Sequence, residues 1–482
     1  ANVSFNTINN NNGSGVNHVS TLRGIITSGG TSASLNINNN GITLFGGGTT
    51  SQLDGISNGA GSTAAGNSIN INNNTLVLNY ASATGATING IVNSSSAATV
   101  NINGNNISAG SIIPGTGTHI LISGGSPVNL NISGNTINNF SRSSATTGTL
   151  RGIVITSPTT TVINNNTISY LSYTNAASTG IIEGIYCLSS SIDVTISNNS
   201  VNGLTAAGGI ITGIREFGVA GNKNIFGNTI YNFSNTAGYA GTGVNYFGIH
   251  CSTGVINIYR NKVYGLTSLG TTGANAAGIF VTGGTTSNIS NNIIGQLYTP
   301  TATGLNAVRG IDISGGTTIN IYNNTVRLDA TSTSVTTFGS SCLQFNTTPT
   351  TVDVRNNIFA NASTPAQEGA NVATNGISAG IRRTTGTAAV VPANYATSSN
   401  KNLFWVNPSA GTNNHTAYAE GTGTVTNLQN TVAALKTFMV NRDQQSVEEN
   451  PTFVSTTGSN VNFLHINTVT PTAVESGASV IG

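Results

Sequence analysis

The sequence predicts an all-β solenoid, in which short strands stack in coils of roughly thirty residues. Three observations predict it. One short phrase recurs along the chain in steps of 29–34 residues. The segments around it alternate apolar and polar residues with a period of two, which is the period of a strand. Only 6% of the residues are charged, and Gly, Asn, Ser and Thr take their place. A repeat this regular indicates a stack of coils and not a set of separate globular domains.

Each copy of the phrase ends a strand at an Asn. An apolar residue lies three positions before this Asn and another two positions after it, as in Ile37, Asn40 and Ile42. An earlier copy is formed by Val3, Asn6 and Ile8. Asn tolerates the left-handed backbone of a tight corner, and its amide can bond the copies on both sides, so we expect a structural Asn ladder. The column consists of Asn40, Asn74, Asn105, Asn135, Asn166, Asn199, Asn228, Asn261, Asn292, Asn324 and Asn357.

Two further columns complete the coil. About 15 residues before each Asn, most copies carry Gly-Ile, as in Gly152-Ile153 and Gly184-Ile185. Five residues after the Asn, several copies carry Leu or Phe, as at Phe140. One coil therefore contains a Gly-Ile strand, a strand that ends at the Asn corner and a strand that follows it. Within the repeats, Gly and Asn interrupt every candidate helix.

These columns resemble the repeats of right-handed parallel β-helices of the pectin-lyase-like superfold over residues 1–360. In texture the chain is similar to Asn/Thr/Gly-rich β-helix proteins secreted by Bacteroidetes. The resemblance implies a right-handed parallel β-helix of about twelve coils and a cargo of the type IX secretion machinery of the outer membrane. Phrases such as 35–42 also fit a leucine-rich repeat, but the period exceeds the usual 20–29 residues and the remainder of each copy predicts a second strand.

Residues 361–482 are expected to form irregular last coils and a C-terminal cap. The segment 430–440 predicts one amphipathic helix, because Val432, Leu435, Phe438 and Met439 share a face. The Asp443–Ser446 turn that follows resembles the closing segment of Bacteroidetes β-helix proteins, in which a sorting domain comes next. The missing initiator Met favours a processed or excised chain. A cap is needed because an open solenoid end exposes apolar core and strand edges.

Composition restricts the partners. The formal net charge is +2 and no basic stripe occurs, which argues against nucleic acid and anionic membranes. No run of ~20 apolar residues occurs, so no membrane insertion is expected. Cys187 and Cys251 follow their Gly by three positions on coils two apart. That separation is too long for a disulfide, so we expect buried free thiols.

The repeat columns also show which residues can lie together in a functional site. No two acidic residues share a column on neighbouring coils, so we assign no catalytic residue, no metal ligand and no cofactor. Arg23 and Asp54, like Arg151 and Glu183, share a column on adjacent coils. We expect exposed cross-strand ion pairs there, or alternatively a binding patch. Aromatic residues near the Asn corner are candidate glycan contacts or strand stabilisers: Tyr231 and Tyr264 in one column, and Tyr259 and Tyr322 in another.

The sequence therefore predicts a secreted or cell-surface, extracellular protein without catalytic activity. An adhesin, stalk or scaffold fits, with extracellular polysaccharide or cell-surface glycans as partners. Two alternatives stay open: a polysaccharide lyase or hydrolase with an unrecognised site, and a phage fibre or filament component.

Overall fold

A computed structural model describes most of the chain as two compact units. Unit 1 comprises Ala1–Thr229 and Phe233–Tyr239, and unit 2 comprises Ile230–Asn232 and Ala240–Gly482. The structure describes residues 1–467 and 469 except 11–19, 31–33, 48–50, 81–84, 111–112, 189–192, 220, 237–244, 336, 365–375, 386–389, 407–414 and 422–424.

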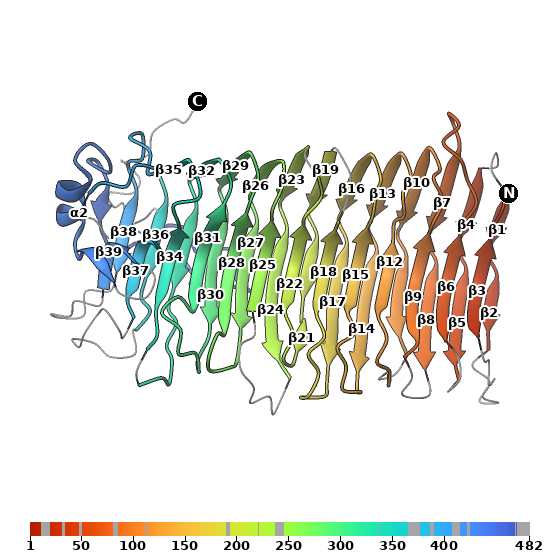
Figure 1. Cartoon of the computed structure of the whole chain (residues 1–482). Helices are drawn as coiled ribbons and strands as arrows, with labels where there is room; N and C mark the ends of the chain where they lie inside the picture. Colours follow the sequence, from red (N-terminus) through yellow and green to blue (C-terminus); the bar gives the residue numbers. More distant parts are fainter. Residues whose placement is uncertain are drawn as a thin grey trace. The chain divides into compact units, whose positions relative to one another are not determined.

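Unit 1 is a parallel β-solenoid in which every coil adds one strand to each of three sheets (Figure 1). Sheet A contains β1 (Asn2–Ser4), β4 (Leu35–Asn38), β7 (Ser68–Asn72), β10 (Thr99–Asn103), β13 (Asn129–Ser133), β16 (Thr160–Asn164), β19 (Asp193–Ser197) and β23 (Asn222–Phe226). Sheet B contains β2 (Thr7–Asn9), β5 (Gly41–Gly46), β8 (Thr75–Tyr80), β11 (Asn106–Ala109), β14 (Thr136–Arg142), β17 (Thr167–Tyr173), β20 (Ser200–Asn202) and β21 (Thr205–Ala206). Sheet C contains β3 (Thr21–Thr27), β6 (Gln52–Asn58), β9 (Thr87–Asn93), β12 (His119–Ser123), β15 (Leu150–Ile155), β18 (Ile182–Cys187) and β22 (Ile211–Glu216).

Unit 2 repeats the same three-strand coil, and β24 (Thr229–Asn235) carries residues of both units. Its sheet A contains β26 (Val255–Tyr259), β29 (Thr286–Ser290), β32 (Thr318–Tyr322) and β35 (Thr351–Arg355). Its sheet B contains β27 (Lys262–Thr267), β30 (Ile293–Tyr298), β33 (Thr325–Leu328), β36 (Ile358–Asn361), β38 (Leu403–Val406) and β41 (Val447–Glu448). Its sheet C contains β25 (Asn245–Cys251), β28 (Asn275–Thr282), β31 (Val308–Gly315), β34 (Ser340–Phe345), β37 (Ser378–Arg383), β39 (His415–Glu420) and the antiparallel β40 (Thr426–Gln429).

The predicted all-β solenoid is confirmed, and the solenoid makes about ten turns. This is slightly fewer than the twelve coils predicted from the copies of the Asn phrase. The core lies between the three sheets, and each sheet contributes fully buried residues such as Ile132, Ile137 and Ile153. In strands such as β7 and β10, the alternation of buried and half-buried residues matches the period of two.

The predicted Asn ladder is confirmed in both units. The amide Nδ2 of Asn74 donates to Oδ1 of Asn105 over 2.9 Å and to the carbonyl oxygen of Ile37 over 2.8 Å. The same donation to the next rung recurs from Asn6 to Asn228 in unit 1 and from Asn261 to Asn402 in unit 2. At the end of unit 2, Asn402 Nδ2 donates to the buried carboxylate of Asp443 over 2.9 Å. The ladder thus satisfies buried amides that would otherwise destabilise the core.

The expectation that the ladder Asn takes the left-handed backbone is wrong. The residue directly before it has a φ between 54° and 66°, and the ladder Asn does not. A residue with a small side chain or none suits that position best, because a Cβ is disfavoured there. The ladder position instead requires a short amide that reaches both neighbouring rungs. The left-handed position is occupied by Phe5, Asn39, Asn73, Gly104, Gly134, Asn165, Asn198, Gly227, Arg260, Asn291, Asn323, Asn356 and Lys401.

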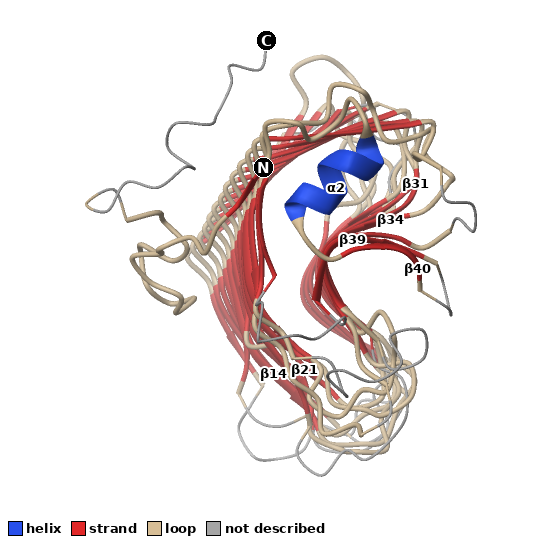
Figure 2. Ribbon diagram, turned by 90° about the vertical axis from the view of Figure 1, so that its left-hand side faces the viewer, coloured by secondary structure: helices blue, strands red, loops and turns tan. Residues whose placement is uncertain are grey.

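The Gly column lies in the sheet C strands and bends them. A Cβ on Gly152 would lie 2.5 Å from the carbonyl oxygen of Gly184 and 2.9 Å from Cγ2 of Ile168, so no larger residue fits without a shift. In β18, Ile182, Ile185 and Cys187 are all fully buried. The alternation therefore shifts by one residue at the Gly, as in a bulge. Figure 2 shows the labelled strands β31, β34 and β39 of unit 2 as an inward-curving layer.

The predicted helix is confirmed as α2 (Val432–Met439), with Val432, Leu435 and Met439 buried. Thr431 begins it, because its side chain accepts a hydrogen bond from the backbone N–H of Ala434 over 3.1 Å. Across the described part of the chain, no helix is long and apolar enough to cross a membrane. The domain boundary expected at residue 360 stays a prediction.

Candidate functional site

The outward face of sheet C is recessed, which distinguishes it from ordinary solvent-exposed strand surface. Asp54 and Glu183 point away from the core at the position before the Gly, yet their exposed fractions are 1% and 0%. Outward residues of sheet A, such as Asn70 and Asn101, are only half-buried. Side chains on the sheet C face therefore lie in an environment where ion pairs and cation–π contacts are less screened by water.

Both predicted ion pairs form on this face. Arg23 Nε lies 3.0 Å from Asp54 Oδ2, and Arg151 Nε lies 2.5 Å from Glu183 Oε2. The strand register pairs the same residues. The expectation that these are freely exposed pairs is wrong, because both carboxylates are buried. The coil bend at the Gly column places them below the surface, where an ion pair must be well satisfied to be retained.

In unit 1, Glu183 is the centre of a larger group, which we name the Arg–Tyr cluster: Arg151, Glu183, Tyr186, Arg215 and Phe217. Arg215 Nη1 lies 2.8 Å from the second oxygen of Glu183. The guanidinium carbons of Arg151 and Arg215 lie 4.3 and 5.2 Å from the Tyr186 ring centroid. Arg215 also lies 4.4 Å from the Phe217 ring centroid. Two guanidiniums and one carboxylate give the cluster a formal charge of +1.

The cluster is held rigidly before any ligand arrives. Strands β15 and β22 flank β18 on opposite sides, so the two arginines approach Tyr186 from opposite sides. Each guanidinium is fixed by a carboxylate bond and by an aromatic ring, which restricts its rotamers. Arg151 and Arg215 keep about a fifth and a quarter of their side chains exposed. They can therefore still offer N–H groups to an anionic group in solution.

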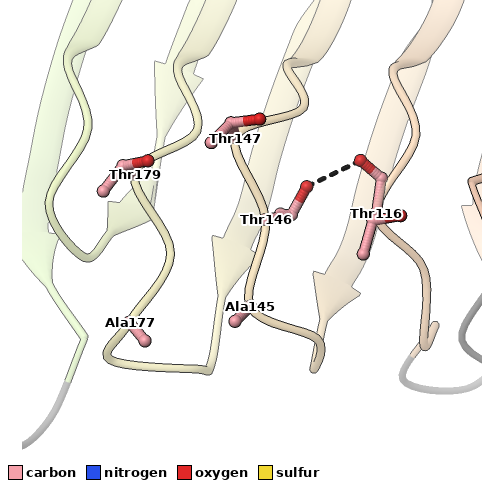
Figure 3. A pocket seen from close by; sticks show the side chains of 6 residues that line it. All are labelled: Thr116, Ala145, Thr146, Thr147, Ala177 and Thr179. Atoms are coloured by element: carbon pink, nitrogen blue, oxygen red, sulfur yellow. Dashed lines mark hydrogen bonds between the residues drawn. The ribbon is translucent and has the colours of Figure 1, made fainter.

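A polar pocket of about 460 Å³ lies in the loops that lead into the same strands (Figure 3). Thr146 Oγ1 donates a hydrogen bond to the carbonyl oxygen of Thr116 over 2.6 Å. The loop with Thr147 enters β15 and the loop with Thr179 enters β18, so the pocket and the Arg–Tyr cluster share two strands. The pocket is lined by Thr116, Ala145, Thr146, Thr147, Ala177 and Thr179.

In unit 2 the corresponding face is more aromatic. The rings of Phe247 and Phe280 stack with centroids 5.1 Å apart, and the ring of His250 lies 4.6 Å from that of Phe280. Arg309 Nη1 lies 2.6 Å from Asp312 Oδ2. Burial raises the pKa of Asp312, and the positive charge of Arg309 opposes that rise. The arginine-with-carboxylate arrangement of unit 1 therefore recurs in unit 2 at Arg309 and Asp312.

The candidate Tyr contacts lie elsewhere. Tyr231 and Tyr264 stack with centroids 5.0 Å apart, as their shared column suggested. Tyr264 is only 7% exposed, because Phe463 packs 5.7 Å from its ring. Tyr322 donates to Asp353 Oδ2 over 2.8 Å, and Tyr259 is half-buried on the same sheet. The Tyr231–Tyr264 stack is thus covered by the C-terminal segment, and the sequence does not indicate this.

Tyr186 and Arg215 were not among the site residues predicted from the sequence. Each lies two positions after a column Gly, at Gly184 and Gly213, so their shared register was a usable signal. The burial of strand residues on this face left no signal in the sequence. Alternation with a period of two is the same for a recessed face and for an exposed one.

The remaining reactive groups are dispersed. Cys187, Cys251 and Cys342 are buried free thiols, as expected for the first two, and burial raises the pKa of Cys187 and Cys342. Among the residues that the structure describes, no group of three or more His, Cys, Asp or Glu side chains could hold a metal ion. Comparison of the chain with protein-family models, curated proteins and solved structures finds no match.

Proposed function

We propose that this chain is a secreted or cell-surface β-solenoid without catalytic activity, which acts as an adhesin or scaffold and binds glycans along the outward face of sheet C. The observation that carries the proposal is the Arg–Tyr cluster. It is a preorganised, positively charged group on an otherwise weakly charged chain, and it lies in a recessed face of a rigid stack. Extended solenoid faces suit extended polymers, because the stacked strands present a repeated surface along the length of the array.

The geometry of Tyr186 favours an acidic glycan over a neutral one. Neutral sugars bind aromatic rings by stacking on a free ring face. Arg151 and Arg215 already lie over the ring of Tyr186. The groups left for a ligand are guanidinium N–H donors, which match the carboxylate or sulfate of an acidic sugar. The Thr hydroxyls of the neighbouring pocket can donate to or accept from sugar hydroxyls.

The state of Glu183 supports a binding role over hydrolysis. A glycosidase uses two carboxylates ~5–9.5 Å apart, one of which must reach the glycosidic oxygen. Glu183 is fully buried, and both of its oxygens are bonded to arginines over 2.5 and 2.8 Å. In this arrangement the carboxylate positions the arginines that a ligand would meet.

Glycan binding is tested by screening the chain against acidic and neutral polysaccharides at two salt concentrations. We expect binding to acidic polymers that weakens with salt, because charged contacts are screened. Arg215→Gln removes one charged hydrogen bond and should weaken binding about tenfold or more. Arg23→Gln is the matched control, since Arg23 lies on the same face outside the cluster and should leave the affinity unchanged. No binding to any glycan would leave only the scaffold role.

Export is proposed separately, on the resemblance of the repeat columns and of the Asp443–Ser446 turn to secreted Bacteroidetes β-helix proteins. Antibody detection in fractions of the native host tests it. We expect the chain in the culture medium or on the outer surface, accessible to added protease. Detection in the cytoplasmic fraction alone would refute export without bearing on glycan binding.

A further inference from the structure

A buried guanidinium in unit 1 has no counter-charge among the residues that the structure describes. Arg142 ends strand β14 and points into the core, and its exposed fraction is 0%. Its Nη2 donates to the carbonyl oxygen of Gly115 over 2.8 Å, and its guanidinium carbon lies 5.4 Å from the Tyr173 ring centroid. Within the described part of the chain, its Nε and Nη1 have no hydrogen-bond partner. Two N–H donors on a full positive charge therefore face a closed interior.

The other described cationic side chains of unit 1 show how unusual this is. Arg23, Arg151, Arg215 and Lys223 each lie within ion-pair distance of a carboxylate. The three carboxylates that they use are Asp54, Glu183 and Glu216, which leaves the exposed Asp193 as the only other acid described in this unit. A buried charge without an ionic partner is strongly unfavourable, so a bound anion would stabilise Arg142.

A second unpartnered group lies beside it. His119 begins β12 and is 1% exposed, and neither of its ring nitrogens has a hydrogen-bond partner. The bridge between Ile113 and Arg142 places the loop that leads into β12 along the end of β14. Burial, and then the charge of Arg142, lower the pKa of His119 to about 3. The imidazole is therefore neutral at neutral pH and offers one N–H donor.

We propose that Arg142 and His119 form an internal binding site for a small monovalent anion, with chloride as the ion available in most media. The donors fit: guanidinium N–H groups of Arg142 and the imidazole N–H of His119 lack partners, the charge of Arg142 acts on His119, and no described carboxylate pairs with Arg142. The small number of donors favours a small monovalent ion over sulfate or phosphate, which carry more charge and need more donors. Water would satisfy hydrogen bonds but would leave the positive charge of Arg142 uncompensated.

The site is connected to the Thr-lined pocket through two loops. Arg142 holds the carbonyl of Gly115, next to Thr116 of the pocket. The hydroxyl of Tyr173, in register with Arg142 on the next coil, donates to the carbonyl of Gly148, next to Thr147. An anion that holds Arg142 in place would thus also hold the loops that carry Gly115 and Gly148. The same loops line the pocket.

Crystallography with bromide tests the site directly. Crystals of the full chain are grown with bromide in place of chloride, and anomalous scattering is collected at the bromine edge. We expect an anomalous peak within hydrogen-bond distance of Arg142 Nε or Nη1. A peak confined to the molecular surface, or density of a water molecule with no anomalous signal at Arg142, would overturn the proposal.

Thermal unfolding provides a second readout in solution. At constant ionic strength, Tm should rise by a constant increment for each tenfold increase of chloride against gluconate, because an ion that binds only the folded state stabilises it. Arg142→Met should abolish this dependence. Arg23→Gln, which removes a cation on the outer face outside the Arg–Tyr cluster, should retain it. If Arg142→Met does not fold, the wild-type chloride dependence and the bromide peak decide, and a wild-type Tm that is indifferent to chloride counts against the site.

Discussion

Replacing Asn166 by alanine removes one rung from the middle of the Asn ladder in unit 1. Asn166 Oδ1 accepts from the backbone N–H and from Nδ2 of Asn135, over 3.0 and 2.9 Å. Its own Nδ2 donates to the carbonyl oxygen of Ile132 and to Asn199 Oδ1, both over 2.9 Å. In the variant, the buried backbone N–H of Asn135 loses its acceptor, and the carbonyl oxygen of Ile132 loses a donor.

Each buried polar group left unpaired costs ~1–3 kcal/mol, so two such groups predict a loss of about 2–6 kcal/mol in the free energy of unfolding. The matched control is Asn70→Ala. Asn70 also stacks with Asn side chains above and below, donating to Asn36 and accepting from Asn101 over 2.8 Å. It lies on the half-exposed outer face, where water replaces the lost partners, so we expect a loss of about 1 kcal/mol or less.

Urea unfolding followed by circular dichroism measures both variants against the wild type. Because coils of a solenoid can unfold in parts, amide hydrogen exchange at Asn135 should accompany it, with markedly faster exchange in Asn166→Ala. The two variants should differ in their loss of unfolding free energy. If the two losses agree to within about 0.5 kcal/mol, burial does not determine how much an Asn rung stabilises the fold, and the reasoning is refuted.

Three further outcomes follow from the same structure. The pKa of His119 falls to about 3 on folding. As the pH drops below 6.5, His119 therefore binds a proton in the unfolded chain but stays neutral in the folded chain. Stability should therefore fall by about 2 kcal/mol between pH 6.5 and 5 in urea titrations, and this contribution should be missing in His119→Leu. Gly152→Ala should lower stability by ~1–3 kcal/mol through overpacking, whereas Gly41→Ala, whose Cβ meets nothing within 4 Å, should not; equal melting temperatures would contradict the explanation of the Gly column. Phe463→Ala should uncover Tyr264 and increase its nitration by tetranitromethane, and an unchanged rate would mean that Phe463 is not what covers the ring.

The coil register was predictable because stacking leaves a periodic trace in the sequence. Arg151 and Glu183 were expected to meet across coils, and they do. The left-handed residue was assigned one position too late, since in many coils Asn occupies both that position and the ladder. The copies with Gly104 and Gly134 carried the distinguishing signal, because Gly marks the position that disfavours a Cβ.

Other features left no periodic trace. Phe463 lies about two hundred residues after Tyr264 in the sequence and outside the repeat, so its contact could not be read from a column. Arg142 occupies a core position next to Tyr173 in the stack, and no local pattern identifies a buried guanidinium. The recessed face of sheet C depends on the curvature of the strands, which is a property of the assembled coil.

The Asn ladder has a direction, and this makes its two ends chemically different. Every amide donates toward the following coil, so each unit begins with an acceptor side and finishes with a donor side. Coils can therefore be gained or lost in the middle of the array without changing any rung, provided that the added coil carries its own Asn. The last donor needs a partner that is not another rung, and Asp443 provides it. The length of such a protein is thus free to change during evolution, whereas the terminal acid that closes the chain of amides is not.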